Sequence, residues 1–174
     1  GRARRDQPEP ADQAAIARPR IGYSGVIDER MDYALIDGIA AARPDWQLVM
    51  VGPVAKVDPA GLPRRRNIHW LGKKSYPELP AYLAGWDAAL IPFARNDATR
   101  FISPTKTPEY LAAGLPVVST SIRDVVTPYG QKNLVTIADT VDETVAALDT
   151  MVSRHGDSPL WLRRVDEVLA RNGW

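Results

Sequence analysis

Two hydroxyls, a proline, a cation and a carboxylate occur within seven residues of this sequence: Ser103, Pro104, Thr105, Lys106 and Glu109. A Ser-Pro-Thr sequence is typical of a helix start, because hydroxyls cap free N–H groups and a proline costs little there. Free amides, the partial positive charge of the helix end and a lysine together favour a phosphate group. A carboxylate one turn further along can accept hydrogen bonds from sugar hydroxyls. These residue types indicate a site for a nucleotide-sugar, although many helices begin in this way and bind nothing.

The residues that follow predict how this cluster is positioned. Gly114 suits the left-handed conformation that ends a helix, and Pro116 prevents the helix from continuing. The apolar run 115–118 is typical of a strand that is buried in a parallel sheet. The stretch 101–120 therefore predicts a loop, a helix and a buried strand, with the polar cluster at the start of the helix.

Strand-like and helix-like segments alternate along the chain. Apolar runs predict strands at 20–24, 46–51, 67–71, 87–92, 117–119 and 133–137. Further helices are predicted at 31–42, 77–84, 142–151 and 160–171. This alternation predicts a single Rossmann-like α/β domain with a doubly wound parallel sheet, in the strand order 3-2-1-4-5-6. Ligands of such sheets bind at the switch point, which the loops 24–30 and 93–105 would flank here.

Composition and charge exclude several classes of protein. A net charge of +1 argues against nucleic acid or an anionic membrane surface as the main partner. The absence of cysteine excludes disulfides and thiolate metal sites, and is compatible with a reducing compartment. Residues 1–19 are rich in arginine, acidic residues and proline, so we predict a flexible linker or tail there. Residues 20–174 then form the folded domain.

Four motifs stand in a fixed order along the chain: GYSGVIDERMD at 22–32, VGP at 51–53, HWLGKKSYPELPAYLAGWDAALIPF at 69–93 and SPTKTPEYLAAGLPVVST at 103–120. In this order they resemble the C-terminal, donor-binding half of a two-domain GT-B glycosyltransferase of the group 1 type. The resemblance covers residues 21–146, and the fourth motif is its most specific part.

The resemblance implies that the diphosphate of a nucleotide-sugar lies between the loop after the first strand and the helix that carries Glu109. Gly25 would allow a close approach to the backbone, and Arg30 and Lys106 would act as catalytic cations that stabilise the leaving diphosphate. Glu109 would hold the ribose hydroxyls. The other donor-binding residues that the resemblance implies are Ser103, Pro104 and Thr105 around the phosphates, and Lys74 and Ser75 beside the base, largely through backbone groups.

Glycosyl transfer is the activity that the resemblance implies, with an NDP-sugar of the UDP or GDP type as donor and neither a metal ion nor another cofactor. An N-terminal domain of the same parent chain would bind the acceptor, and any peripheral association with a membrane would come through that domain. We expect a cytoplasmic location, extending to the inner face of the membrane, and a role in cell-surface polysaccharide or glycan biosynthesis. Without the acceptor domain and the final crossover helix, we expect weak donor binding and no turnover.

The chain departs from the family pattern at two positions. Phe101 stands eight residues before Glu109, where many members carry a second glutamate. The first loop has Arg30 in place of the usual pair of basic residues. Both departures leave the donor sugar and the stereochemical outcome open. Candidates for a polar role in the sugar pocket are Asn96, Asp97 and Thr99.

Two other functions are compatible with the same fold. A nucleotide-sugar epimerase would need acidic and histidine side chains near the anomeric carbon, which are not evident in the sequence. The histidine at His69 is better explained as a packed or edge residue of a strand. A scaffold or regulatory domain that lost the site would explain Phe101, whereas Lys106 and Glu109 argue against it.

Overall fold

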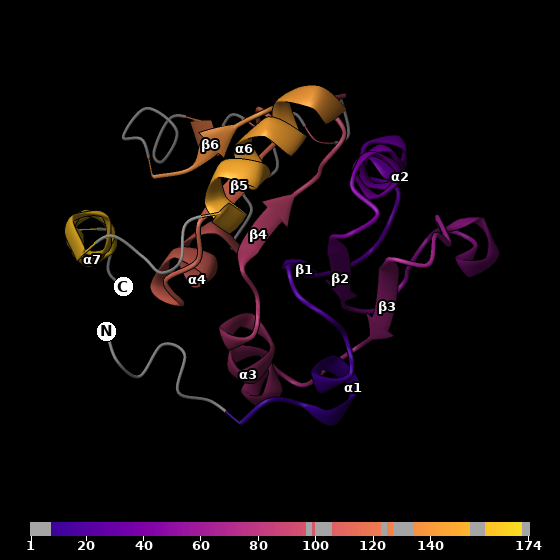
Figure 1. The fold of residues 1–174 in the computed structure, drawn as a ribbon, viewed down its shortest axis with the longest axis horizontal. Coiled ribbons are helices and arrows are strands. Elements are labelled where there is room, and N and C mark those ends of the chain that lie inside the picture. The colour runs from indigo at the N-terminus through magenta and orange to yellow at the C-terminus, as the bar shows by residue number, and fades with distance from the viewer. Residues whose placement is uncertain are drawn as a thin grey trace.

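A sheet of six parallel strands runs through the computed structural model, which describes residues 8–96, 99, 106–122, 125–126, 134–153 and 159–171 (Figure 1). The strands are β1 (Arg20–Ser24), β2 (Gln47–Val51), β3 (Ile68–Gly72), β4 (Ala88–Ile91), β5 (Val117–Ser119) and β6 (Thr136–Ile137). Their order across the sheet is β3-β2-β1-β4-β5-β6. The predicted strand order is therefore confirmed.

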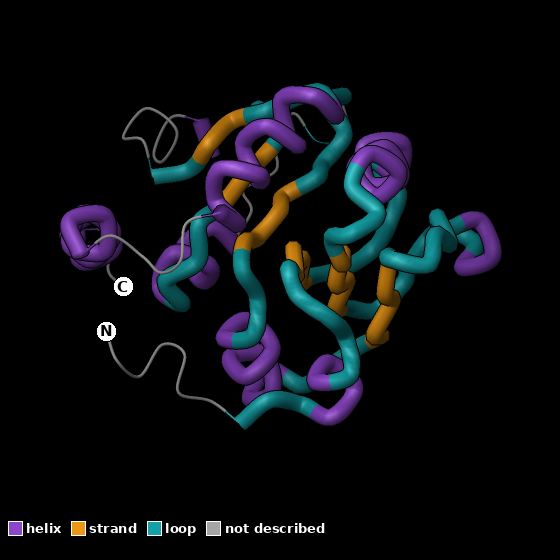
Figure 2. Tube along the Cα trace, in the orientation of Figure 1, coloured by secondary structure: helices purple, strands orange, loops and turns teal. Residues whose placement is uncertain are grey.

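Helices cover both faces of this sheet. Those that the structure describes are α1 (Ala11–Ala14), α2 (Tyr33–Ala42), α3 (Leu79–Ala84), α4 (Lys106–Ala112), α6 (Val141–Ser153) and α7 (Pro159–Arg171). Helices α2 and α6 pack together over one face, while α3 and the contacting pair α4 and α7 lie over the other (Figures 1 and 2). This arrangement is the doubly wound fold that the alternation of elements predicted.

The start of α2 lies two residues later than the predicted helix 31–42. The side chain of Asp32 accepts a hydrogen bond from the N–H of Leu35 at 3.0 Å, so Asp32 is the N-cap. Met31 instead forms a bridge with Phe93 beyond the end of β4. The residues before α2 thus belong to the loop that follows β1.

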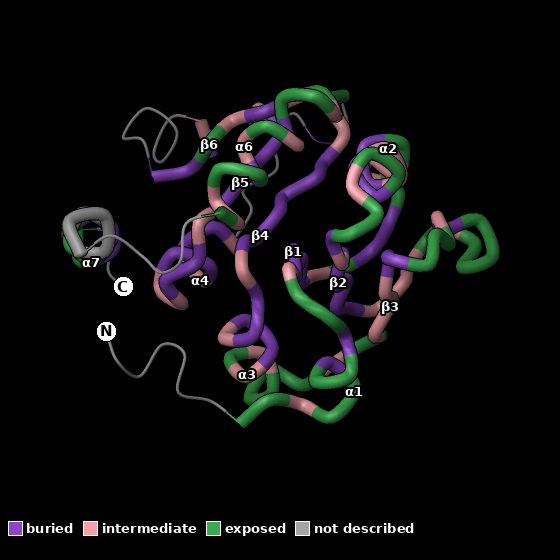
Figure 3. The backbone as a smooth tube through the Cα atoms, viewed as in Figure 1, coloured by how far each residue is buried: buried purple, intermediate pink, exposed green. Residues whose placement is uncertain are grey.

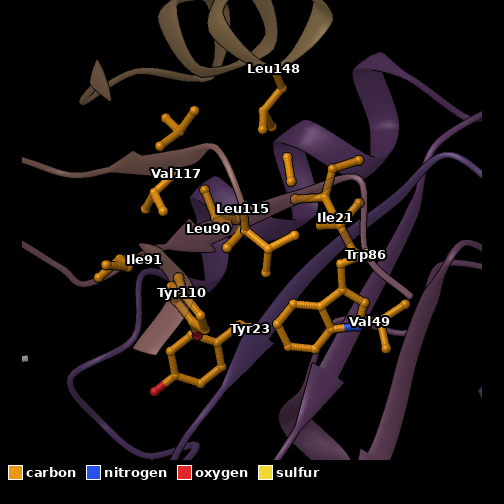
Figure 4. Packing of buried hydrophobic residues seen from close by; sticks show 14 of the residues in the cluster. Ile21, Tyr23, Val49, Trp86, Leu90, Ile91, Tyr110, Leu115, Val117 and Leu148 are labelled. Atoms are coloured by element: carbon orange, nitrogen blue, oxygen red, sulfur yellow. The ribbon is translucent and has the colours of Figure 1, made fainter. Parts of the chain in front are cut away.

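The core depends on a close approach between Gly22 of β1 and the indole of Trp86. A Cβ at position 22 would lie 2.0 Å from Cδ2 of Trp86, which no real side chain tolerates. All five residues of β1 are buried, and burial continues through β2, β4 and β5, whereas the edge strands β3 and β6 are more exposed (Figure 3). The ring of Trp86 packs edge-on against that of Tyr110, with ring centres 6.1 Å apart, within the buried core (Figure 4). Gly22 therefore lets a large aromatic ring cover the central strand.

The segment that precedes β1 is packed against the domain. Gln13 of α1 is fully buried: its side chain accepts a hydrogen bond from Nε1 of Trp86 at 2.9 Å and donates one to the carbonyl of Tyr82 at 3.0 Å. Ile16 joins the hydrophobic core, and Arg20 bonds back to the carbonyl of Ile16. The prediction of a flexible tail is therefore wrong for residues 8–19, while residues 1–7 lie outside the described part. The composition was misleading because polar side chains with satisfied hydrogen bonds and one buried isoleucine, rather than an apolar stripe, anchor the segment.

Replacing Gln13 tests how much this anchor contributes. Gln13→Ala leaves the buried N–H of Trp86 without its partner, so we expect the free energy of unfolding to fall by about 1–3 kcal/mol. Urea unfolding of both proteins measures the difference. Gln47→Ala is the matched control, because Gln47 also bonds to a side chain, that of His69, but at the half-buried surface of the sheet. Equal losses in the two variants would contradict the anchoring role.

Candidate functional site

The switch point lies where β1 separates from β4. Strand β1 stays paired with β2 as far as Ser24 and Val51. Its pairing with β4 ends two residues earlier, at Gly22 and Ala89. A crevice at this point of a doubly wound sheet is where ligands bind, and the two strands lead into the two loops that were predicted to flank it.

These two loops are bonded to each other. The N–H of Asp32 donates to the carbonyl of Pro92 at 2.8 Å, and the N–H of Ala94 donates to the carbonyl of Arg30 at 2.8 Å. The loop after β1 and the first residues of the loop after β4 are therefore held together at the carboxyl edge of the sheet.

Gly25 and Lys106 lie against each other at this edge. Gly25 has a φ of 145°, a conformation that L side chains rarely adopt. A Cβ at position 25 would lie 3.1 Å from Cε of Lys106 and 2.8 Å from the hydroxyl of Tyr23. The structure thus brings together a glycine after β1 and a lysine at the start of α4, two residues that the sequence assigned to one site.

Lys106 and Glu109 also lie on the accessible part of α4. Their side chains are 24% and 19% exposed, and Nζ of Lys106 lies 3.8 Å from Oε2 of Glu109. Their neighbours Thr107, Tyr110 and Leu111 are buried. Helix α4 therefore packs one face inward and leaves the cation and the carboxylate beside the carboxyl edge.

Arg30 is held by Asp28, two residues earlier in the same loop. Nε of Arg30 lies 3.0 Å from both carboxylate oxygens, and its Nη2 lies 2.8 Å from Oδ2. Burial alone raises the pKa of Asp28, but the hydrogen bonds and positive charge of Arg30 outweigh burial and lower it. The guanidinium lies 6.0 Å from the centre of the Phe93 ring, and that ring packs edge-on against Tyr23. Contacts through Phe93 and Tyr23 thus connect Arg30 to the Gly25–Lys106 contact.

Lys74 and Ser75 follow β3 as predicted, but the ammonium group of Lys74 is already engaged. Its Nζ lies 2.7 Å from Oδ2 of Asp12 in α1 and 5.5 Å from the ring centre of Tyr82. The N–H of Ser75 donates to the carboxylate of Glu78 at 3.2 Å. The side chain of Lys74 therefore points toward α1, and its backbone is the part that remains for a ligand.

The remaining polar residues named from the sequence include Asn96 and Thr99, His69, and several that lie outside the described part of the chain. Asn96 and Thr99 bond to each other within a turn, with the N–H of Thr99 3.2 Å from Oδ1 of Asn96. His69 lies on the edge strand β3, where Nε2 is 2.7 Å from Oε1 of Gln47 and partial burial lowers its pKa. The edge position predicted for His69 is confirmed. Predicted residues that lie outside the described part of the chain are Ser103, Pro104, Thr105, Phe101 and Asp97.

Two residues of the site were missed by the sequence analysis. Asp28 was given no role, although it lies only two residues before Arg30 and carries the opposite charge. The hydroxyl of Tyr110 accepts a hydrogen bond from the N–H of Ser24 at 2.8 Å, and no sequence pattern signals this bond because the two residues are far apart along the chain. Within the described ranges, no three acidic or histidine side chains gather as metal ligands, and no helix is long and apolar enough to cross a membrane.

These features define a Rossmann-like α/β domain whose charged residues gather at the switch point. Residues 18–154 match the family described as glycosyl transferases group 1, and the chain belongs to that family. It is 33% identical over 105 residues to TuaH of Bacillus subtilis (strain 168), whose name assigns it to the glycosyltransferases of teichuronic acid biosynthesis. That match covers 59% of this chain and 26% of TuaH, so the chain spans about a quarter of this relative.

Solved structures show the same fold. The C-terminal domain of the group 1 protein LpcC from Francisella tularensis has a TM-score of 0.68 at 16% identity, covering 93% of this chain and 89% of that one. HepE from Anabaena, solved with UDP and glucose, has a TM-score of 0.62 at 14% identity, covering 91% of this chain and 50% of HepE. The chain thus has the fold of a C-terminal domain of a GT-B glycosyltransferase.

The Asp28–Arg30 pair predicts a specific dependence of stability on pH. The lowered pKa of Asp28 means that its contribution is complete above the unfolded value of about 3.9 and is lost as the pH falls through the folded value. Asp28→Asn should cost about 1–2 kcal/mol at pH 7, a range reduced because Arg30 is partly exposed. The difference from the wild type should stay constant down to about pH 4 and shrink as the pH falls further, as measured by urea unfolding at a series of pH values.

Glu29→Gln is the control in the same loop. Its carboxylate lies 3.9 Å from the exposed Lys56, so the replacement should change stability by less than about 0.5 kcal/mol. A difference between Asp28→Asn and the wild type that stays constant as the pH falls below about 4 would show that the carboxylate is not held by Arg30.

Proposed function

We propose that this chain is the donor-binding part of a glycosyltransferase and binds a nucleoside diphosphate sugar at the carboxyl edge of its sheet. The contact between Lys106 of α4 and Gly25 after β1 carries the proposal. It puts a partly exposed cation at the switch point, beside a glycine that leaves the backbone accessible. Membership of the group 1 glycosyl transferase family supports the same reading.

The charged residues take separate roles in this proposal. Lys106 and Arg30 face the diphosphate and stabilise the negative charge that develops on it as the glycosidic bond breaks. Glu109 lies one turn along α4 from Lys106 and accepts hydrogen bonds from the ribose hydroxyls. The backbone at Lys74 and Ser75 borders the base. No step in this scheme calls for a metal ion.

UDP is the first nucleotide to test, because HepE was solved with UDP and glucose. A relative named for teichuronic acid biosynthesis favours a role in cell-surface polysaccharide assembly. The acceptor would then bind to a further domain of the parent protein, at the cytoplasmic face of the membrane. The chain alone binds the donor weakly and does not transfer sugar.

A non-catalytic scaffold is the second candidate, and one observation favours it. Each proposed cation already has a carboxylate partner, Asp28 for Arg30 and Glu109 for Lys106. If these pairs persisted in solution, little positive charge would remain for a diphosphate. The Lys106–Glu109 separation of 3.8 Å is longer than a direct hydrogen bond, so this pair is the easier one to open.

A titration separates the proposed phosphate role of Lys106 from the proposed ribose role of Glu109. The ligands are UDP, GDP, their glucose and mannose conjugates, and inorganic pyrophosphate. We expect amide NMR shifts near Gly25 and Lys106 with a matching nucleotide. Lys106→Ala should lower the affinity for both UDP and pyrophosphate by about tenfold or more, because it removes a charged contact to phosphate. Glu109→Gln should lower the affinity for UDP but not that for pyrophosphate, because pyrophosphate has no ribose.

Lys56→Ala is the matched control, because Lys56 is an exposed cation in the loop after β2 that pairs with Glu29 and has no role in the proposed site. It should bind UDP as the wild type does. No shift with any nucleotide would favour the scaffold, whereas equal loss of UDP binding in the Lys56 and Lys106 variants would remove the site assignment.

A further inference from the structure

The last backbone N–H of β1 has a side chain as its partner. Amides alternate in direction along a strand, and the N–H of Gly25 donates to the carbonyl of Val51 beside β2. The N–H of Ser24 therefore faces the side of β4, where the described pairing with β1 has already ended. It donates instead to the hydroxyl of Tyr110 at 2.8 Å.

The Tyr110 hydroxyl is fully engaged by this strand end. Besides accepting from the N–H of Ser24, it lies 3.3 Å from the carbonyl of the same residue, to which it can donate. Tyr110 is fully buried, and burial raises the pKa of its phenol, so the hydroxyl keeps the proton that it donates. Its ring packs edge-on against Trp86 at 6.1 Å. A side chain of α4 thus fills the gap between two diverging strands.

The same helix carries the charged residues of the site. Lys106 lies one turn before Tyr110, so the two residues are neighbours on α4, with Tyr110 buried and Lys106 partly exposed. The Tyr110 contact fixes the end of β1, and the next residue, Gly25, is the one that Lys106 touches. A shift of α4 along β1 would break both contacts together.

We propose that Tyr110 is a positioning residue, whose hydroxyl locks the start of α4 to the end of β1 and so holds Lys106 and Glu109 at the donor site. This inference rests on the proposed function for what the two charged residues bind. The lock itself does not, because it is a contact between two elements of the ligand-free protein.

Tyr110→Phe tests the lock, because it removes the hydroxyl and keeps the ring against Trp86. Without ligand, the Ser24 amide should exchange with solvent about tenfold faster or more relative to the amides of Val49 and Leu90, which lie inside the sheet. The amide signals of Gly25 and Lys106 should shift. The affinity for UDP and for pyrophosphate should fall by about five- to tenfold. Tyr82→Phe is the matched control: it removes a hydroxyl that bonds to Asp12 at 2.7 Å, and it should leave all of these readouts unchanged.

The two readouts separate failure of the lock from failure of the proposed function. If exchange at Ser24, Val49 and Leu90 rises equally, or if Gly25 and Lys106 keep their shifts, Tyr110 contributes only to general stability and the proposal is overturned. If the wild type binds neither UDP nor pyrophosphate, the proposed function fails, while the exchange and shift data still decide whether Tyr110 locks the two elements.

Discussion

The site depends on how a fully buried strand ends. Every polar backbone group at the end of β1 needs a partner, because a buried unpaired N–H costs about as much as a lost hydrogen bond. Gly25 finds its partner in β2 and Ser24 finds its partner in the hydroxyl of Tyr110. The second bond draws α4 to the switch point, and the placement of Lys106 follows from it. The position of the cation is thus a consequence of satisfying a strand end.

Glycines allow the backbone around the end of β1 to pack closely against its neighbours. A Cβ at Gly52 would lie 1.7 Å from the carbonyl oxygen of Gly25, so the loops after β1 and β2 touch through their backbones. Gly22 likewise leaves room for the indole of Trp86 against the face of β1. Larger residues at these positions would push the loops or the indole away from the strand. The glycines therefore allow the close backbone packing of the loops after β1 and β2, beside which Lys106 lies.

The charges of the site differ in how firmly they are held. Asp28 is nearly buried and contacts Arg30 through both carboxylate oxygens, so rotating that guanidinium away would leave a buried charge without its partner. The contact of Lys106 with Glu109 is longer and partly exposed. Water screens this ion pair, so breaking it costs less free energy. An incoming diphosphate would therefore displace Glu109 from Lys106 more easily than Asp28 from Arg30. This order is consistent with Glu109 turning to a ribose when phosphate occupies the lysine.

Much of this architecture could be predicted from local sequence patterns. Strand 117–119 and the strand order follow from apolar runs, glycine stops and the handedness of crossovers, all of which act over short stretches of chain. The convergence of Gly25, Arg30 and Lys106 on one edge follows from the same topology. The Tyr110–Ser24 bond joins residues 86 positions apart, and the Gln13–Trp86 bond joins residues 73 apart. Single side-chain contacts over such separations leave no periodic trace in the sequence, so neither could be predicted.

The packed segment before β1 also bears on how the base would be recognised. Arg18 and the N–H of Arg20 bond to Asp87 at the amino edge, so this segment supports β1 and β4 from the end that is remote from the switch point. Asp12 of the same segment draws the ammonium group of Lys74 toward α1. A base that lies beyond β3 would then meet the backbone of Lys74 rather than a free charge, because Glu78 already bonds to both the N–H and the C=O of Ser75. Backbone N–H and C=O groups can pair with the edge of a base, whereas a lysine ammonium would favour phosphate over any base. In the proposed site, holding Lys74 away from the edge would keep the attraction for phosphate at Arg30 and Lys106, and this separation would set the direction in which a nucleotide lies across the sheet.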